Sequence, residues 1–206
     1  TKRGKIGKPT ISYNGFYGIQ QIASVPDVLD ADEFWDFKMT RNPDLITDSE
    51  REMHEAGQFT DWIDETTRMG KRQQHTMSLS GGTENMNYFI SGTYLDVTGI
   101  AVGDDFQRFS TRMNLEAKVN EWFTIGTNTQ LSLTDRSGFT PSWSGGVDGA
   151  FYMNPLTKVR DENGKLTIYP WPEDIYWGNP LANTLADSKD KAYKVFTNNY
   201  VNISIP

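Results

Sequence analysis

The chain has 206 residues with no cysteine, two histidines in unrelated contexts and a formal net charge of −7. These features exclude disulfides and cysteine metal sites, make a zinc site of the usual kind unexpected, and argue against a nucleic-acid partner, which needs a basic surface. No run of about 18 apolar residues is present, so no transmembrane helix is predicted, although a membrane β-barrel, which hides its apolar surface in alternate residues, stays compatible with the composition.

The first predicted strand opens at Pro9 and runs to Gln20, with alternate residues on two faces. Residues 21–73 then form a long insertion with short helices. One helix is predicted to take Asp30 or Asp32 as its N-cap, because an acidic first turn precedes an apolar stripe. A second is predicted from Asp48 to Ala56, capped by Asp48 or Ser49 and ended by Gly57.

Four consecutive antiparallel strands are predicted between residues 74 and 138, over 74–80, 88–95, 108–116 and 123–134. In the last of them apolar and polar residues alternate with period two, whereas an amphipathic helix needs three- and four-residue spacing. The link GGTENMN between the first two is predicted to be a hairpin in which Gly81, Gly82 and Asn85 supply positive φ angles.

Residues 139–191 lose the alternation and are rich in Trp, Pro, Gly and Asn, which indicates a second long loop. Within it, ENGK suggests a small hairpin between LTKVRD and LTIYP. A last strand alternates from Tyr193 to Ile205. Because the chain starts in the basic run TKRGKIGK and stops within an alternating segment, we expect it to be part of a longer protein.

The links between the predicted strands divide by length. The short links GGTENM and EAKVNE alternate with the longer links 21–73, DVTGIAVGDD and 139–191. Alternate links of a meander fall at the same end, so the short ones share one end and the longer ones the other. This asymmetry, with strands of about 9 to 11 residues or more, favours a transmembrane β-barrel with short periplasmic turns and long extracellular loops. A soluble β-sandwich stays open as the alternative.

Several long strings resemble the SusC/RagA-type TonB-dependent outer-membrane transporters of Bacteroidota. TKRGKIGKPTISYNGFYGIQ resembles the end of their plug domain and the first barrel strand. TDWIDETTRMG, SLSGGTENMNYFISGTYLDVTGI and DDFQRFSTRMNLEAKVNEWFTIGTN resemble the segments that follow. The resemblance covers roughly residues 1–138, is looser through the second long loop, and returns in the last strand.

The resemblance implies an all-β fold: an antiparallel meander that forms part of a 22-stranded transmembrane barrel closed by a plug, with long extracellular loops that carry short helices. Residues 1–8 would be the C-terminal end of the plug. Residues 9–206 would supply about six barrel strands, with the long loops at 21–73 and 139–191. The implied partners are TonB, through a part outside this chain, a SusD-like surface lipoprotein and outer-membrane lipid.

The implied function is import of nutrient oligomers, most often glycans, across the Gram-negative outer membrane without chemical change. Leu131, Leu133, Val201 and Ile203 would then face lipid. The residues that would face the lumen are the polar residues that alternate with them, namely Arg108, Arg112, Asn114, Asn128 and Gln130. The candidate substrate-binding residues, which could stack on sugar rings, are the loop aromatics Trp143, Trp171, Tyr176 and Trp177.

Two other functions share parts of this pattern. A soluble extracellular carbohydrate-binding β-sandwich would have the same aromatics and alternation. A β-architecture hydrolase could use a carboxylate pair such as Asp61 with Glu65 or Glu173 with Asp174, although such pairs are recognised by separation in space. Neither a cofactor nor a metal is predicted: Asp104 and Asp105 read as turn formers, and an enzyme is not expected.

Overall fold

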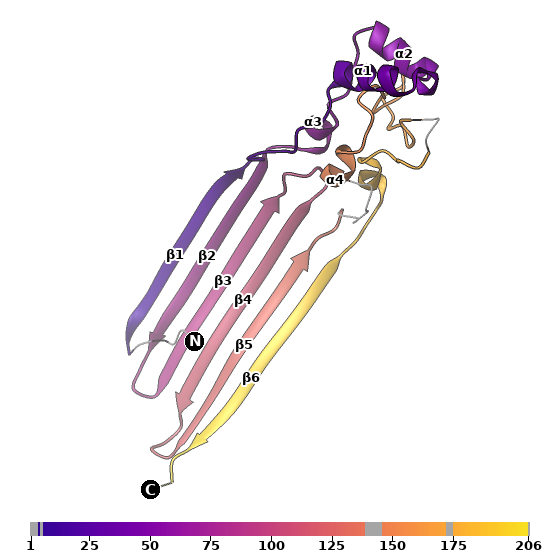
Figure 1. Cartoon of the computed structure of the whole chain (residues 1–206). Helices are drawn as coiled ribbons and strands as arrows, with labels where there is room; N and C mark the ends of the chain where they lie inside the picture. Colours follow the sequence, from indigo (N-terminus) through magenta and orange to yellow (C-terminus); the bar gives the residue numbers. More distant parts are fainter. Residues whose placement is uncertain (1–3, 5, 139–145, 172–174, 206) are drawn as a thin grey trace.

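A single antiparallel sheet of six strands dominates the structure (Figure 1). The computed structural model describes residue 4 and residues 6–138, 146–171 and 175–205. The strands are β1 (Gly7–Gln20), β2 (Gly70–Gly82), β3 (Met86–Thr98), β4 (Asp105–Lys118), β5 (Phe123–Asp135) and β6 (Lys191–Ile203). Each strand pairs with its neighbours in sequence, so the sheet is a meander and the predicted all-β antiparallel fold is confirmed.

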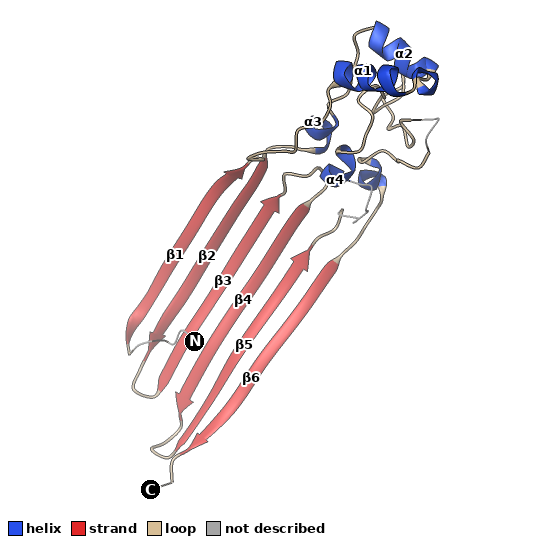
Figure 2. Cartoon of the chain, viewed as in Figure 1, coloured by secondary structure: helices blue, strands red, loops and turns tan. Residues whose placement is uncertain are grey.

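The helices gather beyond one end of the sheet, as the blue ribbons of Figure 2 show. They are α1 (Ala31–Arg41), α2 (Asp48–Glu55), α3 (Trp62–Thr66) and α4 (Gly146–Ala150), with the 3₁₀ helices η1 (Pro43–Leu45) and η2 (Ala182–Leu185). The two short links, 83–85 and 119–122, lie at the opposite end, which confirms the predicted segregation of connections. None of the described helices is long and apolar enough to cross a membrane.

The N-caps of the helices are set by side-chain hydrogen bonds to the first turn, and not by acidic residues alone. Asp30 caps α1 as predicted, because its side chain accepts a hydrogen bond of 2.8 Å from the backbone N–H of Glu33. For α2 the prediction was wrong: Thr47 is the N-cap, and its Oγ1 accepts from the N–H of Glu50 at 3.2 Å while the Glu50 carboxylate accepts from the Thr47 N–H at 2.8 Å. This reciprocal pair is a capping box, which requires the Glu three residues after the cap. Gly57, with φ +64°, ends α2 as predicted.

The β2–β3 hairpin contradicts the expected role of its glycines. Gly81 and Gly82 lie within β2, and neither they nor Asn85 has a positive φ angle. The link closes instead through a 2.7 Å bond from the N–H of Thr83 to the carbonyl of Met86. At Gly81 the missing side chain provides space, since a Cβ there would lie 2.6 Å from the hydroxyl of the opposite residue, Tyr88.

The strand register separates an apolar face from a polar face. Phe109 lies opposite Tyr94 and Leu133, whereas Arg112 lies opposite Ser91 and Gln130. The apolar face presents large exposed side chains: Ile11, Tyr13, Tyr17, Met77, Ile90, Tyr94, Phe109, Leu131, Tyr193, Val195, Val201 and Ile203. The opposite face is mostly polar, although it also carries the aromatic residues Phe16, Phe89, Phe106, Phe196 and Tyr200.

This apolar face does not fit a β-sandwich. In a sandwich the apolar faces of two sheets pack against each other. The described residues form one sheet, and Tyr193 and Val195 on its apolar face remain 75% and 72% exposed. Soluble monomers rarely expose a continuous apolar surface of this extent.

The apolar face ends toward the helices in a row of hydrogen-bonded polar side chains. The Asp96 carboxylate accepts from the Gln73 amide at 3.0 Å and from the Gln107 amide at 3.2 Å. Further along the same row Lys191 and Asp135 form an ion pair of 3.1 Å. The next row toward the short links holds aromatic residues, namely Tyr94, Phe109 and Tyr193. Aromatic residues beside polar ones are typical of a membrane–water interface.

Candidate functional site

The two long loops form one packed unit, called here the head, which comprises the described residues of 21–69 and 136–190. Trp62 of the first loop is buried in a cluster with Met153, Leu166 and Leu181 of the second loop. Its indole N–H donates a 2.9 Å hydrogen bond to the carbonyl of Asn154. The head therefore has a small hydrophobic core of its own beyond the end of the sheet (Figure 1).

A buried carboxylate ties three segments of the head together. Glu50 is completely buried in α2. It accepts 2.7 Å hydrogen bonds on both oxygens from the Lys38 ammonium of α1, and the Asn154 side-chain amide of the second loop donates to it at 2.5 Å. A buried charge without partners costs several kcal/mol, so these partners, with the capping bond from Thr47, explain why the acid is tolerated there.

Lys38 also fixes one of the predicted aromatic residues. Its ammonium lies 5.2 Å from the centre of the Trp171 ring and 5.7 Å from that of Phe34. Both distances suit cation–π interactions. Trp171 therefore belongs to the contact between the two loops.

The other predicted aromatics fall into two groups. Trp177 stacks on Tyr152 with ring centres 5.1 Å apart, and Tyr176 meets Trp177 edge-on at 5.8 Å. Trp177 also packs against the buried cluster, while Tyr152 and Tyr176 are mostly exposed. Trp143 lies outside the described residues. The structure thus brings Tyr176 and Trp177 together and adds Tyr152, which sequence reasoning missed because no periodic pattern marks it.

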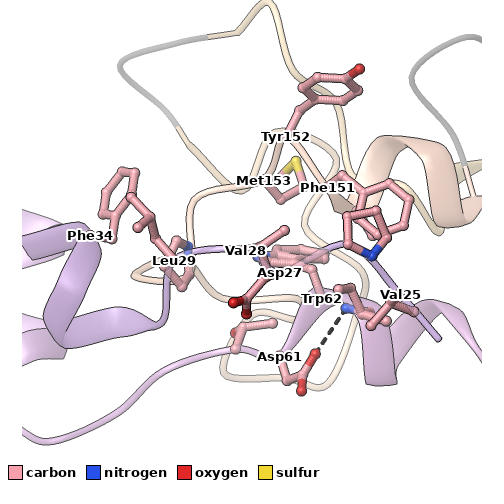
Figure 3. A pocket seen from close by; sticks show the side chains of 15 residues that line it. Val25, Asp27, Val28, Leu29, Phe34, Asp61, Trp62, Phe151, Tyr152 and Met153 are labelled. Carbon is pink, nitrogen blue, oxygen red and sulfur yellow. Dashed lines mark hydrogen bonds between the residues drawn. The ribbon is translucent and has the colours of Figure 1, made fainter. Parts of the chain in front are cut away.

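A pocket of about 560 Å³ opens between the loops (Figure 3). Residues 25–29 with Phe34 form one wall, residues 60–63 a second, and residues 150–153 with Pro155 a third. Most lining side chains are apolar, and two acids, Asp27 and Asp61, also line the pocket. Its first and third walls are separated by more than a hundred residues in sequence, so no local pattern could have predicted it.

Two of the acidic residues singled out in the sequence, Asp61 and Asp105, have structural roles. Asp61 caps α3, accepting hydrogen bonds of 3.0 Å from the N–H groups of Ile63 and Asp64. Asp105 pairs with Arg68 at 2.7 Å beside the β3–β4 link. Glu173 and Asp174 lie outside the described residues. Among the described residues no group of three or more histidine or acidic side chains is arranged to hold a metal ion.

Comparison with known proteins identifies similar sequences and folds, although no protein-family model matches the chain. The TonB-dependent receptor P3 of Formosa agariphila is 28% identical over 189 residues, which cover 88% of this chain and 18% of that protein. The TonB-dependent receptor SusC of Bacteroides thetaiotaomicron is 33% identical over 123 residues, or 56% of this chain and 11% of SusC. A structure of the RagAB peptide transporter aligns with 99% of this chain and with 27% of the transporter chain, with a TM-score of 0.74 and 23% sequence identity.

By sequence and by fold, the chain is related to the TonB-dependent receptors. It spans only 18% and 11% of the lengths of P3 and SusC. The six-stranded meander of this chain corresponds to part of the barrel in the matched transporter structures.

Near the N-terminus, Gly4 lies against β2 and β3 on the polar face of the sheet. Gly4 lies so close to the backbones of Gly81 and Tyr88 that a side chain there would collide with both. Around it the cavity wall includes Asn114 and Glu116, which belong to the polar face. Gly4 therefore lies on the side of the sheet away from the exposed apolar residues.

Proposed function

We propose that the chain is part of the β-barrel of an outer-membrane transporter that imports nutrient oligomers, with glycans as the cargo, and breaks no bond in them. The observation that carries this proposal is the exposed apolar face of a sheet whose opposite face is polar. In a membrane barrel the apolar alternates contact lipid and the polar alternates line the lumen. On this proposal the chain lies in the Gram-negative outer membrane.

The position of the N-terminal segment supports a division of the chain. Residues 1–8 are the end of a plug that fills the lumen, because Gly4 lies against the polar face. Residues 9–206 are barrel strands and loops. On this proposal the head lies outside the cell, where a SusD-like lipoprotein binds, and TonB acts through another part of the protein.

Arginine substitutions on the two faces test the proposal. Leu131→Arg or Val201→Arg places a charge on the lipid side, at a cost of about 2–4 kcal/mol near the membrane midplane. We expect both variants to lower the amount of protein assembled in the outer membrane, measured by membrane fractionation. Gln130→Leu, on the adjacent polar-face position, is the matched control and should assemble normally. Unchanged assembly of both arginine variants with loss of the Gln130 variant would reverse the assignment of faces.

The stacked rings of Tyr152, Trp177 and Tyr176 support a glycan cargo, because exposed aromatic faces stack on the apolar faces of sugar rings. Tyr176→Ala should weaken oligosaccharide binding by about tenfold, as expected for losing roughly 1.4 kcal/mol of contact energy. Tyr169→Ala, another exposed tyrosine of the same loop, is the control. The RagAB structures are named for peptide import, so a peptide panel belongs beside the glycan panel; binding of peptides alone would contradict the glycan assignment.

A further inference from the structure

The segment that covers the pocket is held by few contacts. Residues 21–29, called here the strap, connect β1 to the N-cap of α1 in an extended path. No hydrogen bond joins any of these nine residues to another described residue. Within the described structure their C=O groups, and their N–H groups except at Pro26, are therefore available to a ligand, and the strap can shift to admit one.

The pocket below the strap combines three kinds of surface. Val28, Phe34 and Met153 provide apolar walls, and the strap backbone provides donors and acceptors. Asp27 makes no hydrogen bond or ion pair with the described residues. Asp61 uses only its Oδ1 for the cap of α3, so within the described structure its Oδ2 stays available. The volume of about 560 Å³ suits a small organic group, since ligand pockets span about 300–1,000 Å³.

The negative charge of the surrounding loop favours a positively charged ligand. Residues 21–69 contain thirteen acidic and four basic side chains, a net charge of −9, which exceeds the −7 of the whole chain. A concave surface lined by one sign of charge concentrates ligands of the opposite sign. Two carboxylates in an apolar pocket within this field fit a ligand that carries an ammonium group.

We propose that the strap pocket binds an amino-sugar residue of an imported oligosaccharide, with its ammonium group on Asp27 and Asp61. An amino sugar presents all the matching groups: hydroxyls for the strap backbone, an apolar ring face for Phe34 and Met153, and a positive charge for the two acids. This assignment rests on the proposed uptake of glycans and adds the charge of the cargo to it.

Equilibrium binding to the purified full-length protein in detergent tests the proposal. The probes are the glucosamine hexamer and its neutral N-acetylated counterpart, measured by titration calorimetry near pH 6, where the amines are charged. We expect the amino form to bind wild-type protein at least about tenfold more tightly, as charge-assisted hydrogen bonds are the stronger kind. Asp27→Asn combined with Asp61→Asn should remove that preference, and Asn still caps a helix at position 61.

A matched control separates the pocket from the general field. Asp44→Asn removes one charge from the same loop at a residue that does not line the pocket, so the preference should persist in this variant. Equal binding of both hexamers by wild type would overturn the proposal, and so would an unchanged preference in the double variant. Uptake of neutral glycans could continue in either case, so the proposed function would still stand. Tighter binding of a lysine-rich peptide than of the glucosamine hexamer would also overturn it. Failure of outer-membrane assembly would instead contradict the proposed function.

Discussion

At the scale of single residues, Glu50 shows how one acid can organise two loops. Its carboxylate meets Lys38 of α1, the N-terminus of its own helix and Asn154 of the second loop. Removing one partner of a buried pair leaves the other charge without compensation, which is more costly than losing an exposed pair.

We expect Glu50→Ala to destabilise the head by about 3–5 kcal/mol, the usual cost of breaking a buried pair. Hydrogen exchange of the amides in residues 146–171 measures this, and protection should fall because Asn154 loses its acceptor. Glu55→Ala, at the exposed end of the same helix, is the control and should leave exchange unchanged. Equal protection in both variants would show that the network does not join the loops.

A second residue-scale contact lies on the polar face. Tyr200 of β6 reaches across Gly126 of β5, and its hydroxyl donates a 2.6 Å hydrogen bond to Glu116 of β4. A Cβ on Gly126 would overlap the tyrosine ring. The glycine therefore provides the space that lets one side chain connect three strands.

Gly126→Ala should lower the unfolding free energy by about 1–3 kcal/mol, because overpacking displaces the ring and breaks its hydrogen bond. The midpoint of urea unfolding in detergent reports the change. Gly92→Ala is a matched control within the same sheet, since a Cβ there has no atom within 4 Å. A larger loss for the Gly92 variant than for the Gly126 variant would contradict this explanation.

At the scale of elements, the sequence predicts strands well because each residue's environment alternates along a two-faced strand. The ends of strands are harder to predict than their centres. β2 begins at Gly70 rather than near Gln74, because polar side chains occupy both faces there and hide the alternation. The cap of α2 and the hairpin glycines were misassigned for a similar reason. Their roles depend on partners, Glu50 and Tyr88, that composition alone does not identify.

The head shows the limit of local patterns more clearly. Its two helical segments and the Trp-rich loop could each be predicted, but their contact through Trp62 and Asn154 spans 92 residues. The pocket likewise has walls from both loops. The proposed aromatic residues consequently divide between the loop contact at Trp171 and the exposed stack at Tyr176 and Trp177.

At the scale of the whole molecule, charge and polarity are distributed along two directions. Across the sheet, an apolar face opposes a polar one. Along it, the acidic head lies beyond one end and the short links beyond the other (Figure 1). The proposed position as a barrel wall in an outer membrane would account for both directions together, with lipid on one face and the cell exterior at the head.

The most direct test of this account is a nitroxide scan along β5 in the assembled protein. The chain has no cysteine, so once any cysteine elsewhere in the protein is replaced, single cysteines at residues 128–133 can be spin-labelled specifically. We predict that collisions with oxygen, which dissolves in lipid, rise at 129, 131 and 133 and fall at 128, 130 and 132, while a water-soluble nickel chelate does not reach the odd positions. Oxygen accessibility without a two-residue period, or with maxima at Asn128, Gln130 and Ser132, would contradict the central claim that the apolar face contacts the membrane.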